Sequence, residues 1–437
     1  MPYAEAIIRR AMPVIEVRRP FATRLGAALA LLIALAMFTL SGGVLWTLGI
    51  NYDGITGSAA TKIHIATYLT AMTFLLMLVF SRHPVVFAAS ALSRNPGAIT
   101  FLVAALLLGA FIIIDGRRGI ATVFDTYLVA GLVVLIVGEL DLAGKRRIER
   151  LLHVLMTANA LLALAETMLD VRFFPYRFDG ESFDWDHRST ALLGHPLENA
   201  AATAVYTITL VSGGGRSLPS PLRLPVVLLQ LGALVAFGGR SGLTITLAMI
   251  AYWGMTRLVH ILRGGSASMS SVVYGALLLP VLAIAIGGLA AMGFFDLTFD
   301  RFFTDDGGSA QARLGMLDLL GQIPLSALLF GADPDLIASL QKAEGLEWGI
   351  ENPIVRLVLY QGVAFTTFLV VGFVLFMRDI ARRTRDGTLL PFLTFFVVIN
   401  TSESISNKTL TLARFALLML VMFPIEDDDE EPSPIRR

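Results

Sequence analysis

The chain has 437 residues, of which 55% are hydrophobic and 16% are charged, and its mean hydropathy is +0.72. Soluble domains carry about 25% charged residues, and the apolar residues here gather in runs of roughly 17–25, about the span of a bilayer core. These features predict an all-α polytopic membrane protein. The formal net charge of +0 argues against a nucleic-acid partner, which usually requires a basic face. The absence of cysteine excludes disulfides and thiolate metal sites.

The first 24 residues are basic and contain Arg9, Arg10, Arg18, Arg19 and Arg24. Two interpretations are open: a short amphipathic helix lying on the membrane surface, or a disordered basic leader. The apolar run that begins near Phe21 is too long for a cleavable signal peptide, and no small-residue cleavage site follows a short apolar region. We therefore expect residues 1–24 to be a leader that is retained.

About twelve apolar segments are predicted to span the membrane. They lie at about 22–46, 63–81, 98–115, 121–140, 150–168, 190–211, 223–238, 241–259, 271–293, 353–377, 389–401 and 409–425. No internal repeat and no low-complexity linker interrupts them, so we expect residues 1–437 to form a single membrane domain.

Lysine and arginine predict the orientation, because loops on the cytoplasmic side carry an excess of both. If the N-terminus is cytoplasmic, most basic residues fall in cytoplasmic loops, and the acidic tail 426–437 is cytoplasmic as well. The polar segments 51–62, 170–189 and 294–352 then lie outside, the last as a large periplasmic loop. Arg117 and Arg118 are the one mild exception to this charge pattern.

A polar segment precedes and opens the predicted span at 190–211, and it contains Arg188, His195, Glu198 and Asn199. On a helix, His195 and Asn199 share one face. These residues are candidates for binding a substrate, because polar groups at membrane depth are costly. The alternative is a polar seam between helices. Three further charged residues within or beside predicted spans are expected to form ion pairs inside the bundle: Glu166, Glu403 and Arg414.

Arg240 and Arg313 are candidates for binding phosphate. Arg240 opens an apolar run within AFGGRSGLT, where three glycines allow a ligand or a backbone to approach closely, and the arginine fork suits bidentate phosphate binding. The alternative is an arginine that extends to lipid headgroups. Arg313 lies in a predicted helix from about Ala310 to Leu320, and its alternative is a surface arginine paired with a nearby aspartate.

Glu351 stands at the mouth of a predicted span, in WGIENPIVR. A carboxylate at a membrane boundary can have a raised pKa and act as a base. The alternative is a helix start, since an acid followed by Asn352 and Pro353 suits the first turn of a helix. Arg356 follows about one and a half turns later and is either a second cation or the ion-pair partner of Glu351.

Motifs for nucleotides and catalytic metals are missing from the sequence. It contains no HExxH pair, no Walker loop and no GxGxxG after a strand. We therefore expect no cofactor and a reaction that is independent of metal ions.

Four segments resemble the O-antigen ligase and polymerase superfamily, over about residues 185–375. They are RSTALLGHPLENA (188–200), GGRSGLT (238–244), Ala312 to Leu317 with LLFGAD (328–333), and ENPIVRLVLYQG (351–362). They are similar, in order, to the family's G-x-x-x-x-P-N span, its Ser-Arg-(Gly/Ser) helix start, its arginine-containing loop helix and G-x-G turn, and its His-Asn motif with a glycine about ten residues on.

The resemblance implies a bacterial inner-membrane glycosyltransferase of GT-C-like architecture. Its donor is a glycan on undecaprenyl diphosphate, and Arg240 and Arg313 bind the diphosphate. Glu351 stands where ligases carry a histidine, and a carboxylate can still act as the base. The remaining candidates then position donor or acceptor: Arg188, His195, Asn199, Asn352 and Arg356.

The function expected from this resemblance is that of an exopolysaccharide or O-antigen polymerase. It would transfer glycan, with inversion at the anomeric carbon, to a lipid-linked repeat unit outside the cytoplasmic membrane. A flippase and a chain-length regulator are expected partners. The first alternative is a ligase that moves finished glycan onto a lipid or protein acceptor. The second is a secondary transporter, which typically carries inverted repeats and broken helices at the membrane midplane.

Overall fold

The structure is a computed structural model that describes residues 20–425 with the exception of several short gaps and two longer ones. The gaps are 82, 118, 184–185, 266–279, 281–282, 285–286, 289–290, 292–315, 317, 345, 347–349, 351 and 402–404. The predicted leader (apart from residues 20–24), the acidic tail, most of the predicted span 271–293 and much of the loop 294–352 therefore lie outside the described residues.

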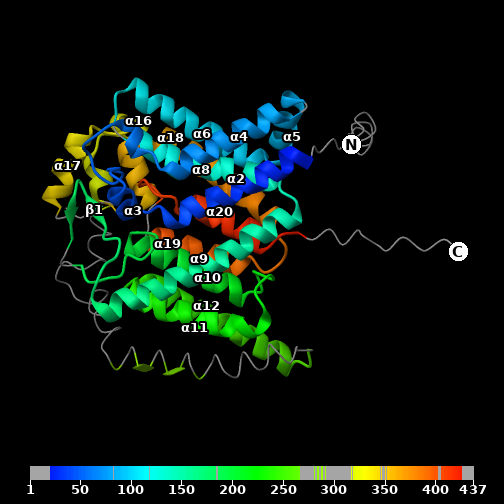
Figure 1. Ribbon diagram of the computed structural model, residues 1–437. Coiled ribbons are helices and arrows are strands. Elements are labelled where there is room, and N and C mark those ends of the chain that lie inside the picture. The colour runs from blue at the N-terminus through cyan, green and yellow to red at the C-terminus, as the bar shows by residue number, and fades with distance from the viewer. Residues whose placement is uncertain are drawn as a thin grey trace.

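The described chain is almost entirely helical, as predicted, and its helices lie side by side in one bundle (Figure 1). The first half contains α2 (Pro20–Thr39), α3 (Gly42–Thr47), η1 (Ala59–Lys62), α4 (Ile65–Phe80), α5 (Pro84–Arg94), α6 (Pro96–Ile114), α7 (Ile120–Thr122), the π-helical η2 (Val123–Leu128), α8 (Val129–Gly138) and α9 (Leu142–Leu169). The second half contains β1 (Arg177–Phe178), β2 (Glu181–Ser182), α10 (Pro196–Val211), α11 (Ser220–Ala236), α12 (Arg240–Leu262), α16 (Leu325–Phe330), α17 (Pro334–Ala343), α18 (Pro353–Arg382), α19 (Leu389–Thr401) and α20 (Thr411–Met422).

Five described helical stretches are long and apolar enough to cross a membrane, judged by length and composition. They are Pro96–Ile114, Ile120–Gly138, Leu142–Leu169, Arg240–Leu262 and Pro353–Arg382. Five shorter apolar helices accompany them: Leu25–Thr39, Ile65–Phe80, Ser220–Ala236, Leu389–Thr401 and Thr411–Met422. The prediction of a helical membrane protein is confirmed at this level.

The centre of the bundle is formed by α10 and α20. Every residue of α20 is buried, and so are most residues of α10. A helix that is apolar on all sides belongs inside a bundle rather than at its surface, and α20 accordingly packs against α8, α9 and α10. Arg414 is the one charged residue of α20, so its position in this core requires a partner.

Glycine allows α18 to bend and to approach α16. Gly362 has φ 82° and ψ 163°, which interrupts the helix, and a Cβ at this position would stand 2.4 Å from the Leu329 carbonyl oxygen. Only glycine adopts this conformation without strain and leaves room for the neighbouring backbone. Nearby, the amide of Ala332 donates to the carbonyl of Leu359 at 2.9 Å.

The short elements α3, β1, α16 and α17 gather at one end of the bundle, which we call the hairpin end (left in Figure 1). Asp179, in the turn between β1 and β2, accepts hydrogen bonds from the amides of Ile55 and Thr56 at 2.9 and 3.0 Å. The segments 51–62 and 170–189, predicted to lie on one side, are therefore joined directly.

Arg117, one of the two basic residues that did not fit the predicted charge pattern, also lies at the hairpin end. Its contacts give a structural reason for a basic residue there. Its guanidinium donates to the carbonyl oxygens of Tyr360 at 2.7 Å and Gly331 at 3.3 Å, and its Nε pairs with Asp115 at 2.5 Å. The arginine thus ties α6 to the bend of α18.

The opposite end joins the loops that the sequence predicted to be cytoplasmic. Arg94 pairs with Glu139 at 2.7 Å, and Arg383 donates to the Arg94 carbonyl at 2.6 Å. The amide of Arg385 donates to the carbonyl of Phe423 at 3.1 Å. The start of α2 and the end of α20 lie at this end in Figure 1.

Several predicted boundaries were wrong. The span 22–46 is divided into α2 and α3, because Ser41 caps α3 by accepting from the Val44 amide at 3.4 Å. The span 190–211 begins as a helix only at Pro196, since Ala191 and Gly194 have φ values of 36° and 79°. The amphipathic helix α5 was not predicted, and α9 begins at Leu142, earlier than the predicted 150.

The described part of the loop 294–352 is built around a small apolar core of its own. Ten buried side chains form it, from the segment that precedes α16, from α16, α17 and the start of α18, and from the connections between these helices: Met316, Leu319, Ile323, Leu328, Ala332, Ile337, Leu346, Ile350, Val355 and Leu359. This part of the loop is therefore a folded unit attached to α18.

Candidate active site

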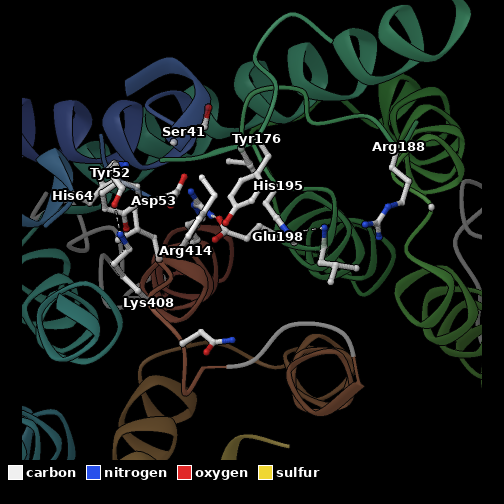
Figure 2. A pocket seen from close by; sticks show the side chains of 18 of the residues that line it. Ser41, Tyr52, Asp53, His64, Tyr176, Arg188, His195, Glu198, Lys408 and Arg414 are labelled. Carbon is white, nitrogen blue, oxygen red and sulfur yellow. Dashed lines mark hydrogen bonds and ion pairs between the residues drawn. The ribbon is translucent and has the colours of Figure 1, made fainter. Parts of the chain in front are cut away.

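A cavity of about 930 Å³ opens among the segments of the hairpin end, between the starts of α3, α10, α12, α18 and α20 (Figure 2). Its lining is rich in polar and charged side chains. They are Ser41, Tyr52, Asp53, His64, Tyr176, Arg188, His195, Glu198, Arg240, Ser241, Arg356, Thr401, Asn407, Lys408 and Arg414. A volume near the upper end of the usual 300–1,000 Å³ for ligand pockets accommodates a large, polar ligand.

Four of the predicted site residues line this one cavity: Arg188, His195, Arg240 and Arg356. They come from the 170–195 loop, α10, α12 and α18, and the fold is what brings them together. The cavity also contains Ile350, which directly precedes Glu351 in the chain. Arg313 and Glu351 themselves lie outside the described residues.

Arg240 is the first residue of α12 and is half-buried at the edge of the cavity. The chain can turn into α12 here because Gly238 has φ 62°, and a Cβ on Gly239 would stand 2.4 Å from the Ala200 Cβ. The amide end of a helix carries a partial positive charge, so the backbone and the Arg240 guanidinium present the same sign to this part of the cavity.

Arg188 is held in place by Asp186. The carboxylate of Asp186 accepts from Nε and Nη2 of Arg188 at 2.8 and 2.6 Å, a bidentate pair. Burial alone would raise the pKa of Asp186, but the hydrogen bonds and charge of Arg188 outweigh it and lower that pKa. The pair is partly exposed, and the Arg188 stem lies over Gly238. Arg188 is therefore a positioned cation whose charge is already largely balanced.

His195 caps α10, and its ring lies at the cavity wall. Nδ1 accepts from the amide of Leu197 at 3.3 Å, so the neutral ring carries its proton on Nε2. The ring of Tyr176 meets the His195 ring edge-on, with centroids 5.1 Å apart. The imidazole is therefore oriented by two neighbours and presents an N–H donor on its other side.

Glu198 and Arg414 form a buried ion pair that joins α10 to α20 (Figure 2). Arg414 Nη1 donates to Glu198 Oε2, and its Nε donates to the Met37 carbonyl at 2.8 Å. Glu198 Oε1 accepts from the Thr409 hydroxyl at 3.1 Å. Both charges are thus satisfied within the bundle, as the sequence predicted for Arg414.

Asp53 presents a carboxylate to the cavity and has no such partner. Within the described part of the chain, this carboxylate makes neither a hydrogen bond nor an ion pair. Its Oδ2 lies against the backbone of Gly42, where a Cβ would stand 1.6 Å away. Burial, together with the charges of Glu198 and Asp125, raises the pKa of Asp53 to about 7, and Lys408 and Lys62 oppose the rise.

Next to Asp53, a hydrogen-bonded network fixes the position of Tyr52. The Tyr52 hydroxyl donates to Asp125 Oδ2 at 2.9 Å, and Asp125 also accepts from the His64 amide at 3.0 Å and the Thr67 hydroxyl at 2.7 Å. Asp125 lies on the π-helical turn η2, a distortion that is frequent at functional sites.

Lys408 closes this side of the cavity. Its Nζ donates to the Tyr52 carbonyl at 2.6 Å and lies 3.5 Å from the centre of the Tyr52 ring. Burial lowers the pKa of Lys408, although the nearby carboxylates of Asp53 and Asp125 act in the other direction. Lys408 is thus a partly desolvated cation near Asp53.

Arg356 lies between two cavities, since it lines the first and also a second one of about 800 Å³ that contains Asp115, Arg117, Asp333 and Asp335. Its guanidinium is 5.6 Å from the centre of the Tyr360 ring. Among the described residues, no hydrogen bond or ion pair satisfies this guanidinium. An arginine held in a cavity without a counter-ion is suited to binding an anionic ligand.

Two predicted substrate-binding residues do not line the cavity. Asn199 is fully buried, and its Nδ2 donates to the carbonyls of Thr190 at 2.7 Å and His195 at 3.1 Å. Asn352 caps α18 by accepting from the amides of Ile354 and Val355 at 3.0 and 3.1 Å. Both asparagines shape the segments that carry His195 and Arg356, and neither is placed to contact a ligand in the cavity.

The sequence did not identify Asp53, Lys408 or Tyr176 as site residues. Each lies in a short polar connection without a recognisable motif, and only the fold brings these connections to the cavity. The sequence did contain one signal for Asp53. It is the only acidic residue of segment 51–62, which follows the first predicted span and is predicted to lie outside. Charged residues at a membrane boundary are functional candidates by default.

The described residues contain no group of three or more His, Asp or Glu side chains that could hold a metal ion. In comparisons with protein-family models, curated proteins and solved structures, nothing matched this chain.

Proposed function

We propose that the protein is a membrane glycosyltransferase that forms a glycosidic bond from a polyprenyl-diphosphate-linked donor. The observation that supports this proposal most strongly is the composition of the cavity. Five cationic side chains and two carboxylates line it, at one end of a bundle of apolar helices. The Arg356 guanidinium has no hydrogen bond or ion pair within the described residues, and Glu198 balances only Arg414. Such a site suits a diphosphate bearing a sugar.

The diphosphate is bound by Arg240 and Arg356 in this proposal, with Arg313 as the further cation that the family resemblance predicts. Arginine forks bind phosphate oxygens in pairs, and their charge stabilises the negative charge that develops as the diphosphate leaves. Arg188, which Asp186 holds, and His195, with its Nε2 proton, then lie where they can donate hydrogen bonds to sugar hydroxyls.

The reaction joins an acceptor hydroxyl to the anomeric carbon of the donor sugar. The hydroxyl gives its proton to a carboxylate, the new C–O bond forms, and the bond to the diphosphate breaks with its electron pair. Attack opposite the leaving group inverts the anomeric centre. No metal ion and no nucleotide sugar take part, because the diphosphate ester already activates the sugar. The sequence assigns the carboxylate role to Glu351.

The architecture that belongs to this proposal has about twelve spans of GT-C-like type in a bacterial inner membrane, with the hairpin end facing the periplasm and both termini in the cytoplasm. The division of the loops between two ends of the bundle supports it, since segments 51–62 and 170–189 share the hairpin end and the basic loops around Arg94 and Arg383 share the other. Undecaprenyl diphosphate is the carrier, with a flippase and a chain-length regulator as partners.

Arginine substitutions test the proposal in the native host. Arg240→Ala, Arg313→Ala and Arg356→Gln should each lower the amount of polymer by about 10²–10³-fold, the usual cost of losing a group that stabilises a leaving charge. The matched control is Arg94→Gln, because Arg94 pairs with Glu139 at the opposite end. Full-length polymer from an inserted Arg240→Ala or Arg313→Ala variant would show that the assignment is wrong.

Polymerase and ligase differ in what accumulates when the gene is deleted. Loss of a polymerase leaves single repeat units on the carrier lipid, whereas loss of a ligase leaves long chains on it. We propose the polymerase, and gel electrophoresis of the lipid-linked glycans from the deletion strain distinguishes the two. Substrate translocation without formation of any bond would instead indicate the transporter.

A further inference from the structure

Asp53 differs from every other described carboxylate around the cavity in having no partner. Glu198 is taken by Arg414 and Thr409, and Asp186 accepts two hydrogen bonds from Arg188. Asp125 is engaged by a tyrosine, a threonine and a backbone amide. Within the described chain, only Asp53 among these four carboxylates lines the cavity without a hydrogen bond or ion pair of its own.

The backbone fixes where the Asp53 carboxylate lies. Tyr52, the preceding residue, is anchored through its hydroxyl to Asp125 and through its carbonyl to Lys408. On the other side, the side chain of Asp53 rests on Gly42, where any larger residue would displace it. The carboxylate is therefore held at a defined place on the cavity wall, where Figure 2 shows it among the other lining side chains.

The Asp53 carboxylate also lies in the same cavity as the cations assigned to the diphosphate. Arg240 and Arg356 line the cavity from the starts of α12 and α18, while Asp53 enters from the connection after α3. A donor diphosphate on the two arginines leaves its sugar in the space between them and the remaining walls. An acceptor hydroxyl in that space meets a carboxylate that has no other hydrogen bond to make.

We propose that Asp53 is the catalytic base, which accepts the proton of the attacking hydroxyl in place of Glu351. The inference rests on the proposed glycosyl transfer. In the step, the acceptor O–H bond breaks and its proton passes to Asp53, the acceptor oxygen bonds to the anomeric carbon, and the diphosphate leaves with the electron pair of the C–O bond. Asp53 then returns its proton to water, and no further reactant is needed.

The electrostatic surroundings agree with this role. The titratable or charged groups around Asp53 are Tyr52, Lys62, Asp125, Glu198 and Lys408. Burial and the two acidic neighbours raise the pKa of Asp53 to about 7, against the effect of the two lysines. A base whose pKa lies close to the operating pH is the most efficient one, because a substantial fraction of it is ionised and the ionised form still accepts a proton strongly.

The pH dependence of the reaction separates Asp53 from Glu351. The full-length protein is purified in lipid nanodiscs and supplied with lipid-linked repeat units extracted from a host strain that lacks this gene. Release of undecaprenyl diphosphate and formation of longer glycans are measured between about pH 5 and pH 9. The variants are Asp53→Asn, Asp53→Glu and Glu351→Gln, with Glu139→Gln as a carboxylate-to-amide control at the opposite end of the bundle.

For wild type we expect a rate that rises with pH through a midpoint near 7. Asp53→Asn should lower kcat by about 10²–10⁴-fold and abolish this rise, whereas Asp53→Glu should keep part of the activity with a shifted midpoint. Glu351→Gln should keep the midpoint, whatever its rate, and Glu139→Gln should behave as wild type. Binding of undecaprenyl diphosphate alone should persist in Asp53→Asn, since the arginines remain.

Each contrary result has one meaning. If Asp53→Asn retains the wild-type rate and midpoint, Asp53 is not the base, while glycosyl transfer by wild type still stands. If the midpoint disappears in Glu351→Gln instead, Glu351 is the base. If Asp53→Asn fails to fold, the pH profile of Glu351→Gln still decides which of the two carboxylates is the base. If wild type itself forms no bond from these repeat units, the proposed function is wrong, and the inference about Asp53 is wrong with it.

Discussion

The carboxylate of Asp53 rests on the α-carbon of Gly42, so closely that a methyl group on Gly42 would stand 1.6 Å from Asp53 Oδ2. Gly42 is the first residue of α3, directly after the break that divides the first predicted span. The break therefore has a role in the site, because it brings a residue without a side chain to the place where Asp53 must lie.

Gly42→Ala should displace the Asp53 carboxylate and lower the rate of transfer at least about tenfold, since a misplacement near 1 Å can cost far more than that. Protein yield and melting temperature should change little, because the displaced group lies on a cavity wall. The control is Gly26→Ala in α2, where a Cβ meets only the flexible Met77 side chain at 3.5 Å. Equal activity of the two variants would show that the contact at Gly42 does not position the base.

The ion pair between Glu198 and Arg414 should be critical for stability. Removal of one partner leaves a buried charge uncompensated, which typically costs about 3–5 kcal/mol. We expect Arg414→Met and Glu198→Met each to lower the melting temperature strongly. The double variant should lose less than the sum of the two, because no unpaired charge remains. Strictly additive losses would show that the two residues are not coupled.

The raised pKa of Asp53 also predicts how stability depends on pH. The folded protein holds the proton up to about pH 7, while the unfolded chain releases it near 3.8, the ordinary pKa of an aspartate. Folding therefore binds a proton between these values, and the contribution of Asp53 to stability falls as the pH rises through that window. Thermal unfolding at several pH values should show Asp53→Asn gaining stability over wild type toward pH 8. No gain, or a gain only in acid, would contradict the raised pKa.

Asp179 should hold in place the segment after α3 that contains Asp53. It accepts from the Thr56 hydroxyl, the Asn51 side chain and the amides of Ile55 and Thr56, and these hydrogen bonds lower its pKa. Asp179→Ala should speed amide hydrogen exchange at Ile55 and Thr56 and reduce the rate of transfer. The control is Glu181→Ala in the same hairpin. Unchanged exchange at both amides would show that the hairpin does not hold this connection.

The sequence predicted the helical membrane class and four of the cavity residues, for a physical reason. Arg188, Arg240 and Arg356 are charged groups beside long apolar runs, and such groups are costly unless they serve a function. This energetic cost can be recognised from the sequence alone, because the charge and the apolar run are neighbours along the chain. The same reasoning marked Asn199, which proved to be a buried link between backbone segments, because an asparagine that joins backbone segments and one that binds a ligand look alike in a sequence.

Asp53 and Lys408 could not be predicted in the same way. They are separated by most of the chain and meet only because Tyr52 bonds to Asp125 on η2 and Thr126 bonds to the Asn407 carbonyl at 2.7 Å. The ends of the helices could not be located from hydropathy either, because they also depend on local hydrogen bonds. The break at Ser41 depends on a side-chain cap that competes with continuation of an apolar helix, and hydropathy does not register it.

The most direct measurement is the release of undecaprenyl diphosphate by purified protein in nanodiscs, supplied with lipid-linked repeat units from the deletion strain and followed together with glycan length. We expect wild type to release one carrier diphosphate for each glycosidic bond formed, without added metal ion or nucleotide sugar. Arg240→Ala and Arg356→Gln should release about 10²–10³-fold less, and Arg94→Gln should match wild type. Failure of wild type to form any bond, or an undiminished rate in either cavity-arginine variant, would contradict the proposed function.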